Sequence, residues 1–267
     1  MIIAAYAGTG KSTFAARIPN AVDLAIMPRS WILPPPGSEE RNEREKGRLD
    51  RLPDPFFPDN YLLDILKAER EYDYVLIPTN AYVISQLRME YGRKLVVCHP
   101  ARDLKEEYRE RFLKRGNSEE FLSLFLEQWD RMLIPVQIEN VVPIVMQSGE
   151  YLTDLKERLD QELLSDDTEP VPDKMLEELE QVMESQRHKY VLQIGGDFHF
   201  RYQITDIMDP EERYFLAEVA RKVHEDLPDM SIEITHALPI DKYLSKDVVT
   251  DDRVKVLNFL EEQIVKQ

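Results

Sequence analysis

The feature that most constrains the fold is a glycine-containing loop near the amino terminus, in the stretch AYAGTGKST. The loop follows the apolar run Ile2–Tyr6, which has the length of a buried strand, and precedes Lys11–Arg17, which has helical spacing. Gly8 and Gly10 let the backbone turn sharply between the two. The order of strand, glycine loop and helix is typical of an α/β chain with a largely parallel sheet.

Short apolar runs continue to alternate with longer amphipathic ones up to about residue 150. We predict strands at Ile2–Tyr6, Ala21–Leu24, Tyr74–Ile77, Lys94–Cys98 and Val142–Met146. We predict helices at Lys11–Arg17, Tyr61–Glu71, Ala81–Tyr91, Leu104–Arg115 and Ser118–Leu133. This alternation predicts a three-layer α/β domain.

Charge is unevenly distributed along the 267 residues, whose formal net charge is −17. Residues 1–149 carry a net −2, whereas residues 150–184 carry −10 and include the linker-like SDDTEPVPD. We therefore predict an α/β domain over residues 1–165, an acidic linker and helix over 166–185, and a small module over 186–267.

The predicted module has a different hydrophobic period. YVLQI and FHFRYQI flank a glycine-rich turn, and the second run alternates strictly, which indicates a β-hairpin. Asp209 and Pro210 supply the cap and first position of a following helix. A strand at Ser231–Thr235 and a helix at about Asp251–Val265 would complete a small C-terminal α+β module.

Residues 33–60 interrupt the α/β rhythm with six prolines and the charged run SEERNEREKGRLDR. We interpret them as a surface excursion around a short charged helix, and long loops of this kind often carry function. Nearby aromatic residues are open to two interpretations: they stack an acceptor base, or they form a small core under the loop. These residues are Trp31, Phe56, Phe57 and Tyr61.

The loop residues fit the Walker A spacing, with Ala5 in place of the first glycine. Successive backbone N–H groups in such a loop form a nest for phosphate oxygens, the lysine reaches the β and γ phosphates, and the hydroxyl of the next residue binds Mg²⁺. The spacing therefore predicts a site for ATP and Mg²⁺, in which Lys11 contacts phosphate and Ser12 is the metal ligand. The nucleotide-binding residues predicted from the loop are Ala7, Gly8, Thr9, Gly10, Lys11, Ser12 and Thr13.

A second candidate element is the segment 102–115, which has six basic and four acidic residues. Arg111, Lys114 and Arg115 share one helical face, and Gly116 would end that helix. The segment is either a cationic lid over the transferred phosphate or a solvated helix with pairs such as Glu107 and Arg111.

The order of these motifs resembles the P-loop nucleoside and nucleotide kinases, especially small phage-type deoxynucleotide kinases, over about residues 1–160. The resemblance implies that Arg111 and Arg115 act as lid arginines on the transferred phosphate. It also implies that Gly149, in the turn Ser148-Gly149-Glu150 after the last strand, borders the adenine.

The chain departs from that family where an acidic residue is expected. Pro78-Thr79-Asn80 follows the third predicted strand, so the Walker B carboxylate is missing. The nearest substitutes are Asp23 and the pair Arg29-Ser30. Asp23 could serve as a base or as a second-shell acid of Mg²⁺, although an Asp at a strand end is also a common cap. Asn80 is equally consistent with a helix cap.

We expect an ATP- and Mg²⁺-dependent phosphotransferase with a nucleoside or nucleoside monophosphate as acceptor, in which Lys11, Arg111, Arg115 and Asp23 are catalytic. The alternative is a nucleotide-binding regulatory or scaffolding protein without such transfer, and a weaker option is a kinase of nucleic-acid ends. The acidic balance argues against duplex nucleic acid or anionic membrane as partner. We expect a cytoplasmic protein, because no signal peptide or apolar span is visible, and leave a homodimer open.

Overall fold

The computed structural model describes residues 1–33, 51–133, 139–195, 199–238 and 247–266. The described chain separates into two compact units. Unit 1 comprises Met1–Ile26 and Pro58–Leu179, and unit 2 comprises Met27–Phe57 and Glu180–Gln267. The division differs from the sequential one expected from the charge pattern, because the segment 27–57 belongs with the carboxyl-terminal residues.

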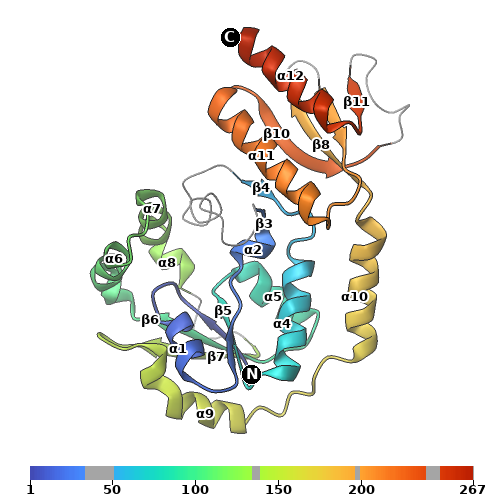
Figure 1. The fold of residues 1–267 in the computed structure, drawn as a ribbon. Coiled ribbons are helices and arrows are strands. Elements are labelled where there is room, and N and C mark those ends of the chain that lie inside the picture. Colours follow the sequence, from blue (N-terminus) through green and yellow to red (C-terminus); the bar gives the residue numbers. More distant parts are fainter. Residues whose placement is uncertain (34–50, 134–138, 196–198, 239–246, 267) are drawn as a thin grey trace. The chain divides into compact units, whose positions relative to one another are not determined.

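Unit 1 contains a five-stranded sheet in the order β2-β5-β1-β6-β7 (Figure 1). Every neighbouring pair in this sheet is parallel. The strands are β1 Ile2–Ala5, β2 Ala21–Asp23, β5 Tyr74–Pro78, β6 Leu95–Pro100 and β7 Val141–Met146. All five predicted strands are confirmed, with ends that differ by one or two residues.

Helices flank this sheet, as a parallel sheet requires. They are α1 Lys11–Arg17, α4 Asp59–Glu71, α5 Ala81–Met89, α6 Lys105–Lys114, α7 Glu119–Glu127, α8 Trp129–Met132 and α9 Lys156–Leu164, with 3₁₀ turns η1 Arg102–Leu104 and η2 Leu152–Leu155. The α/β class is therefore confirmed, and the arrangement is compatible with a three-layer domain.

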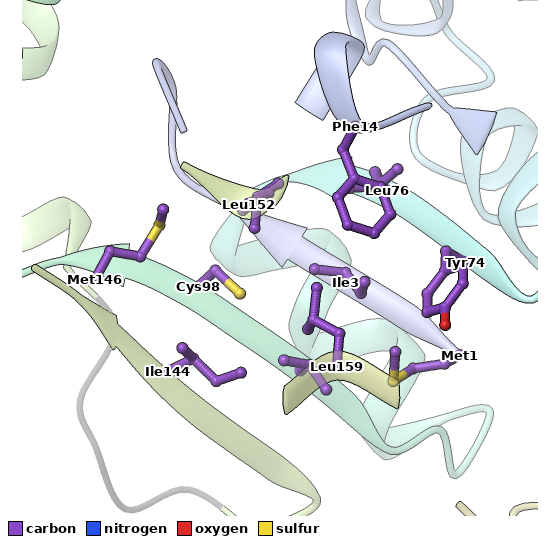
Figure 2. Packing of buried hydrophobic residues seen from close by; sticks show 12 residues of the cluster. Met1, Ile3, Phe14, Tyr74, Leu76, Cys98, Ile144, Met146, Leu152 and Leu159 are labelled. Carbon is purple, nitrogen blue, oxygen red and sulfur yellow. The ribbon is translucent and has the colours of Figure 1, made fainter. Parts of the chain in front are cut away.

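The buried residues explain why the strands read as continuous apolar runs. On one face Ile3, Leu76 and Cys98 pack beneath Phe14 of α1 and Leu159 of α9 (Figure 2). Their neighbours along the strands are equally buried: β1 is inaccessible at every residue. A strand buried on both sides needs no polar alternation. Cys98 is part of this core.

The predicted helix Ser118–Leu133 is wrong as a single element, because it is broken at Gln128 into α7 and α8. The side chain of Ser118 caps α7 by accepting a hydrogen bond from the N–H of Phe121. After the break the Trp129 indole donates to the carbonyl of Arg102, and its ring packs edge-on against Tyr6. Packing of a large aromatic side chain accompanies the interruption of the helical spacing.

Unit 2 contains a four-stranded sheet in the order β10-β8-β9-β11. The predicted hairpin is confirmed as the antiparallel pair β8 and β9, and Phe200, Tyr202 and Ile204 of its alternating face are buried. The elements are β8 Tyr190–Gly195, β9 His199–Gln203, β10 Ser231–His236, β11 Val248–Thr250, α11 Pro210–Asp226 and α12 Arg253–Lys266. The side chain of Asp209 caps α11, as predicted. Strand β11 was not predicted.

The segment Met27–Phe57, which includes residues 33 and 51–57 of the proline-rich excursion, belongs to unit 2. It forms α2 Met27–Ser30 and a two-stranded antiparallel pair, β3 Trp31–Ile32 with β4 Leu52–Pro53. Phe56 packs against Tyr190, and the buried carboxylate of Asp54 accepts a hydrogen bond from Arg213 of α11 at 2.6 Å. The predicted short charged helix falls on residues 34–50, outside the described residues.

The linker 166–172 leads into α10, Asp173–Gln186, which crosses from one unit to the other. Within unit 1 this linker is held by arginines: Arg93 donates to the Glu169 carbonyl and Arg70 to the Val171 carbonyl. Arg93 also forms a buried ion pair with Glu69 at 2.6 Å. The acidic linker is therefore packed against its domain at two points.

Among the described helices, none combines the length and the hydropathy needed to cross a membrane.

Candidate functional site

The glycine loop connects β1 to α1 at the carboxyl edge of the parallel sheet. β1 lies at the centre, and the following strands are added first on its β5 side and then on its β6 side. In open α/β sheets, ligands bind outside the carboxyl ends of the strands where the strand order reverses in this way. The loop therefore lies at the topological switch point of the sheet.

The two glycines adopt the conformations that their residue type allows. Gly8 has φ of 79° and Gly10 has φ of 93°, both in the left-handed region. A Cβ atom on Gly8 would lie 3.0 Å from the Phe112 ring, and one on Gly10 would lie 3.2 Å from the Tyr151 ring. Both the backbone and the surrounding side chains thus require glycine at these two positions.

Several backbone N–H groups of the loop have no acceptor. Thr9 donates back to the Tyr6 carbonyl, and its hydroxyl donates to the same oxygen at 2.7 Å. Within the described ranges, the N–H groups of Gly8, Gly10 and Lys11 make no hydrogen bond to another residue. The same holds for Ser12 and Thr13, because the first turn of a helix has no intrahelical acceptor for them.

Lys11 is folded back against the strand that precedes the loop. Its ammonium group donates to the carbonyls of Ala5 at 2.8 Å and Tyr6 at 3.3 Å. Burial lowers the pKa of Lys11 to about 8, while Asp23 raises it and Arg115 lowers it further. Burial therefore makes the charged form of Lys11 costly unless an anion lies nearby.

Ser12 and Asp23 lie together. The Ser12 hydroxyl donates to the Asp23 carboxylate at 2.6 Å, which links the start of α1 to the end of β2. Oxygen ligands of this kind suit Mg²⁺, which keeps several waters and needs only one or two protein ligands beside phosphate oxygens. No group of three potential metal-ligating side chains gathers anywhere among the residues that the structure describes. A metal held here would therefore depend on a bound phosphate.

The two lid arginines differ in their surroundings. The side chain of Arg111 is 9% exposed, and its guanidinium donates to the carbonyls of Gly8 and Glu150 and to the Glu107 carboxylate. Arg115 is exposed at the end of α6, and among the described residues its guanidinium has no hydrogen-bond or ion-pair partner. It remains close enough to Lys11 to lower the pKa of that lysine. The structure thus leaves Arg115 as an exposed cation whose charge acts on Lys11, and it engages Arg111 in hydrogen bonds to Gly8, Glu107 and Glu150.

The remaining predicted residues take mainly local roles. The Asn80 side chain accepts hydrogen bonds from the N–H groups of Tyr82 and Val83 and caps α5. Gly149 has φ of 78°, and its N–H donates to Glu107 at 3.1 Å. Tyr61 is buried, and its hydroxyl donates to the Leu24 carbonyl at 2.6 Å. For Tyr61 and Phe56 the core interpretation is therefore favoured over base stacking.

The sequence analysis assigned no role to Tyr108 and Tyr151, whose rings contact the Arg111 guanidinium. The spacing of Glu107 and Arg111 indicated their ion pair, which the structure confirms at 2.6 Å. Nothing in the spacing indicated that the same carboxylate would accept hydrogen bonds from Ser148 and Gly149, 41 and 42 residues later in the chain.

Comparisons with protein-family models and with curated protein sequences find no match for this chain.

Proposed function

We propose that the loop from Ala5 to Thr13 is a phosphate-binding P-loop and that the protein is an ATP- and Mg²⁺-dependent phosphotransferase. The observation that carries the proposal is the set of loop N–H groups without acceptors, which belong to the same loop as the buried Lys11 ammonium and lie at the switch point of the sheet. Backbone amides and a lysine in this arrangement form an anion nest for phosphate oxygens.

In this proposal, Lys11 exchanges its two carbonyl acceptors for the β and γ phosphates. Ser12 would hold a bound Mg²⁺, and Asp23 would orient the Ser12 hydroxyl. A bound Mg²⁺ would neutralise charge on the phosphates. Arg115 supplies the cation that meets charge developing on the transferred group, because it is exposed and unengaged where Arg111 is not.

The proposed acceptor is a nucleoside or nucleoside monophosphate, supported by the small size of the cationic surface on α6. Lys114 and Arg115 are exposed at its end, and a pair of charges suits a mononucleotide better than a polymer, which needs a stripe of them. Residues 33 and 51–57 of the excursion belong to unit 2, so the proposal assigns no acceptor contact to them.

A phosphotransfer assay on the full chain tests the proposal. Labelled ATP with Mg²⁺ is incubated with a panel of nucleosides and monophosphates, and we expect label in one acceptor class. Lys11→Ala should abolish transfer while leaving the melting temperature nearly unchanged. Arg115→Ala should lower turnover by roughly 10²-fold or more with little change in ATP affinity, and unchanged turnover would remove Arg115 from the site.

A second candidate function is a nucleotide-binding regulatory or scaffolding protein. It is favoured by the end of β5, where Pro78 and Thr79 precede an Asn80 that serves as a helix cap, so no carboxylate stands where a Walker B acid would. The same assay separates the two functions. If ATP binds but label moves only slowly to water, the regulatory function holds and the transferase is rejected.

A further inference from the structure

Arg111 joins three segments that are far apart in the sequence. Its guanidinium donates to the Gly8 carbonyl in the loop at 3.3 Å and to the Glu150 carbonyl in the turn after β7 at 3.0 Å. It also donates to Glu107, one turn earlier in α6, at 2.6 Å. The fork geometry of a guanidinium allows such simultaneous contacts, which a single ammonium group cannot reproduce.

Two aromatic rings enclose the same guanidinium. Its central carbon lies 4.6 Å from the Tyr108 ring centroid and 4.2 Å from that of Tyr151. Tyr108 is fully buried, and the Tyr151 ring also contacts the position where Gly10 would carry a Cβ. Cation–π contacts of this kind hold the charged group in place. Tyr151 therefore touches both the arginine and the second loop glycine.

Glu107 extends the connection on the other side of the arginine. Its carboxylate accepts from the Ser148 hydroxyl at 2.8 Å and from the Gly149 N–H at 3.1 Å. Burial raises the pKa of Glu107, but these hydrogen bonds and the Arg111 charge outweigh that effect and hold it below its usual value. The carboxylate thus stays ionised and paired at neutral pH.

The other hydrogen bonds within the loop are local: Thr9 donates to the Tyr6 carbonyl, and Lys11 donates to the carbonyls of Ala5 and Tyr6. The hydrogen bond from the Leu152 N–H to the Thr9 carbonyl, at 3.0 Å, is a second link between the loop and the segment that follows β7. A loop with two glycines in the left-handed region has many alternative conformations, and ordering them on binding costs free energy. A residue that orders the loop before the ligand arrives removes part of that cost.

We infer that Arg111, paired with Glu107, is a positioning residue that holds the phosphate loop and the turn Gln147–Tyr151 in one preformed arrangement. The inference rests on the proposed nucleotide site and deepens it: Arg111 acts through the Gly8 carbonyl and does not contact phosphate. Its role therefore differs from that of Arg115. To reach a phosphate, Arg111 would have to give up three hydrogen bonds and two ring contacts.

Hydrogen exchange of the full chain without nucleotide tests this inference directly. In Arg111→Met we expect the hydrogen-bonded amides of Thr9 in the loop and of Gly149 and Leu152 after β7 to exchange faster together, by about tenfold, which is the scale of one hydrogen bond to a charged group. Arg111→Lys keeps the charge but not the fork, so it should not restore protection. Arg109→Met is the matched control, because Arg109 lies on the exposed side of the same helix.

Binding and turnover give the second readout. A positioning role predicts that Arg111→Met raises the Kd for ATP·Mg²⁺ by about tenfold while kcat at saturation stays within a factor of about 2 to 3. Loss of kcat with unchanged Kd, full rescue by Arg111→Lys, or faster exchange confined to α6 would each overturn the inference. The exchange experiment contains no nucleotide, so its result does not depend on the proposed function. If the wild-type protein binds no ATP, the proposed function is rejected, and the exchange result still tests the inference about Arg111.

Discussion

Lys11 is the residue whose chemistry depends most on its surroundings. Its ammonium is held by two carbonyl oxygens and desolvated, which lowers its pKa to about 8. A phosphate brought beside it would favour the charged form and raise that pKa. Above pH 8, Lys11 of the free protein is mostly deprotonated, so nucleotide binding there should be accompanied by the uptake of a proton.

This difference predicts a pH dependence of nucleotide affinity. The affinity of the wild type for ATP·Mg²⁺ should be constant below about pH 7 and fall as the pH rises through about 8. Calorimetric titration at pH 7, 8 and 9 measures it. Lys11→Arg keeps its charge over this range and should show no comparable fall. An equal decline in both proteins would assign the effect to another group.

At the scale of elements, the loop and α6 pack so closely that Gly8 is required for two reasons: its backbone conformation and the lack of space for a Cβ atom. A Cβ on Gly8 would lie 3.0 Å from the ring of Phe112, which is wholly buried. Gly116 offers a matched comparison: its φ of 72° is similar, but a Cβ there would meet nothing within 4 Å.

We therefore predict different costs for the same substitution at the two glycines. Gly116→Ala should lower the free energy of unfolding by about 1 to 2 kcal/mol, the cost of a left-handed alanine. Gly8→Ala should cost roughly 1 to 3 kcal/mol more, because overpacking is added. Urea denaturation of both variants measures the difference. Equal costs would mean that α6 moves away from the loop without penalty.

At the scale of the whole molecule, unit 2 is assembled from two segments far apart in the sequence. Arg213 on α11 pairs with Asp54, whose side chain is 2% exposed and also accepts from the Phe56 N–H at 2.9 Å. The pair joins the segment 27–57 to the carboxyl-terminal residues. Unit 2 should therefore lose stability if this contact between its two segments is broken.

Arg213→Met leaves the Asp54 carboxylate buried without its cation, and we expect a loss of about 3 kcal/mol in the stability of unit 2. Arg221→Met on the same helix is the control, because its partners Glu218 and Glu225 are surface neighbours, and it should cost less than about 1 kcal/mol. Hydrogen exchange of β4 and β8 measures both. A loss no larger than that of the control would contradict the role of the pair.

Local pattern was sufficient for the five strands of unit 1 and for its helices α1, α4, α5 and α6. The five strands are apolar because the sheet is buried on both faces. Caps such as Ser118 and Asn80 in unit 1 and Asp209 in unit 2 act over two or three residues, so they can be recognised from neighbouring residues in the sequence. The glycine loop was predictable for the same reason: both its positive φ values and its spacing to Lys11 are local properties.

The contacts that give the candidate site its character are long-range, and no spacing rule reaches them. Arg111 was predicted to face a phosphate. The groups that contact it come from three segments: the Gly8 carbonyl of the loop, side chains of α6, and the Glu150 carbonyl and Tyr151 ring after β7. The excursion was assigned to the α/β domain because it follows β2, whereas packing against β10 and α11 places it in unit 2. Sequence order specifies which residues can turn, cap and fill a strand. Only packing in three dimensions decides which distant groups form ion pairs or ring contacts, because burial energy depends on neighbours in space and not along the chain.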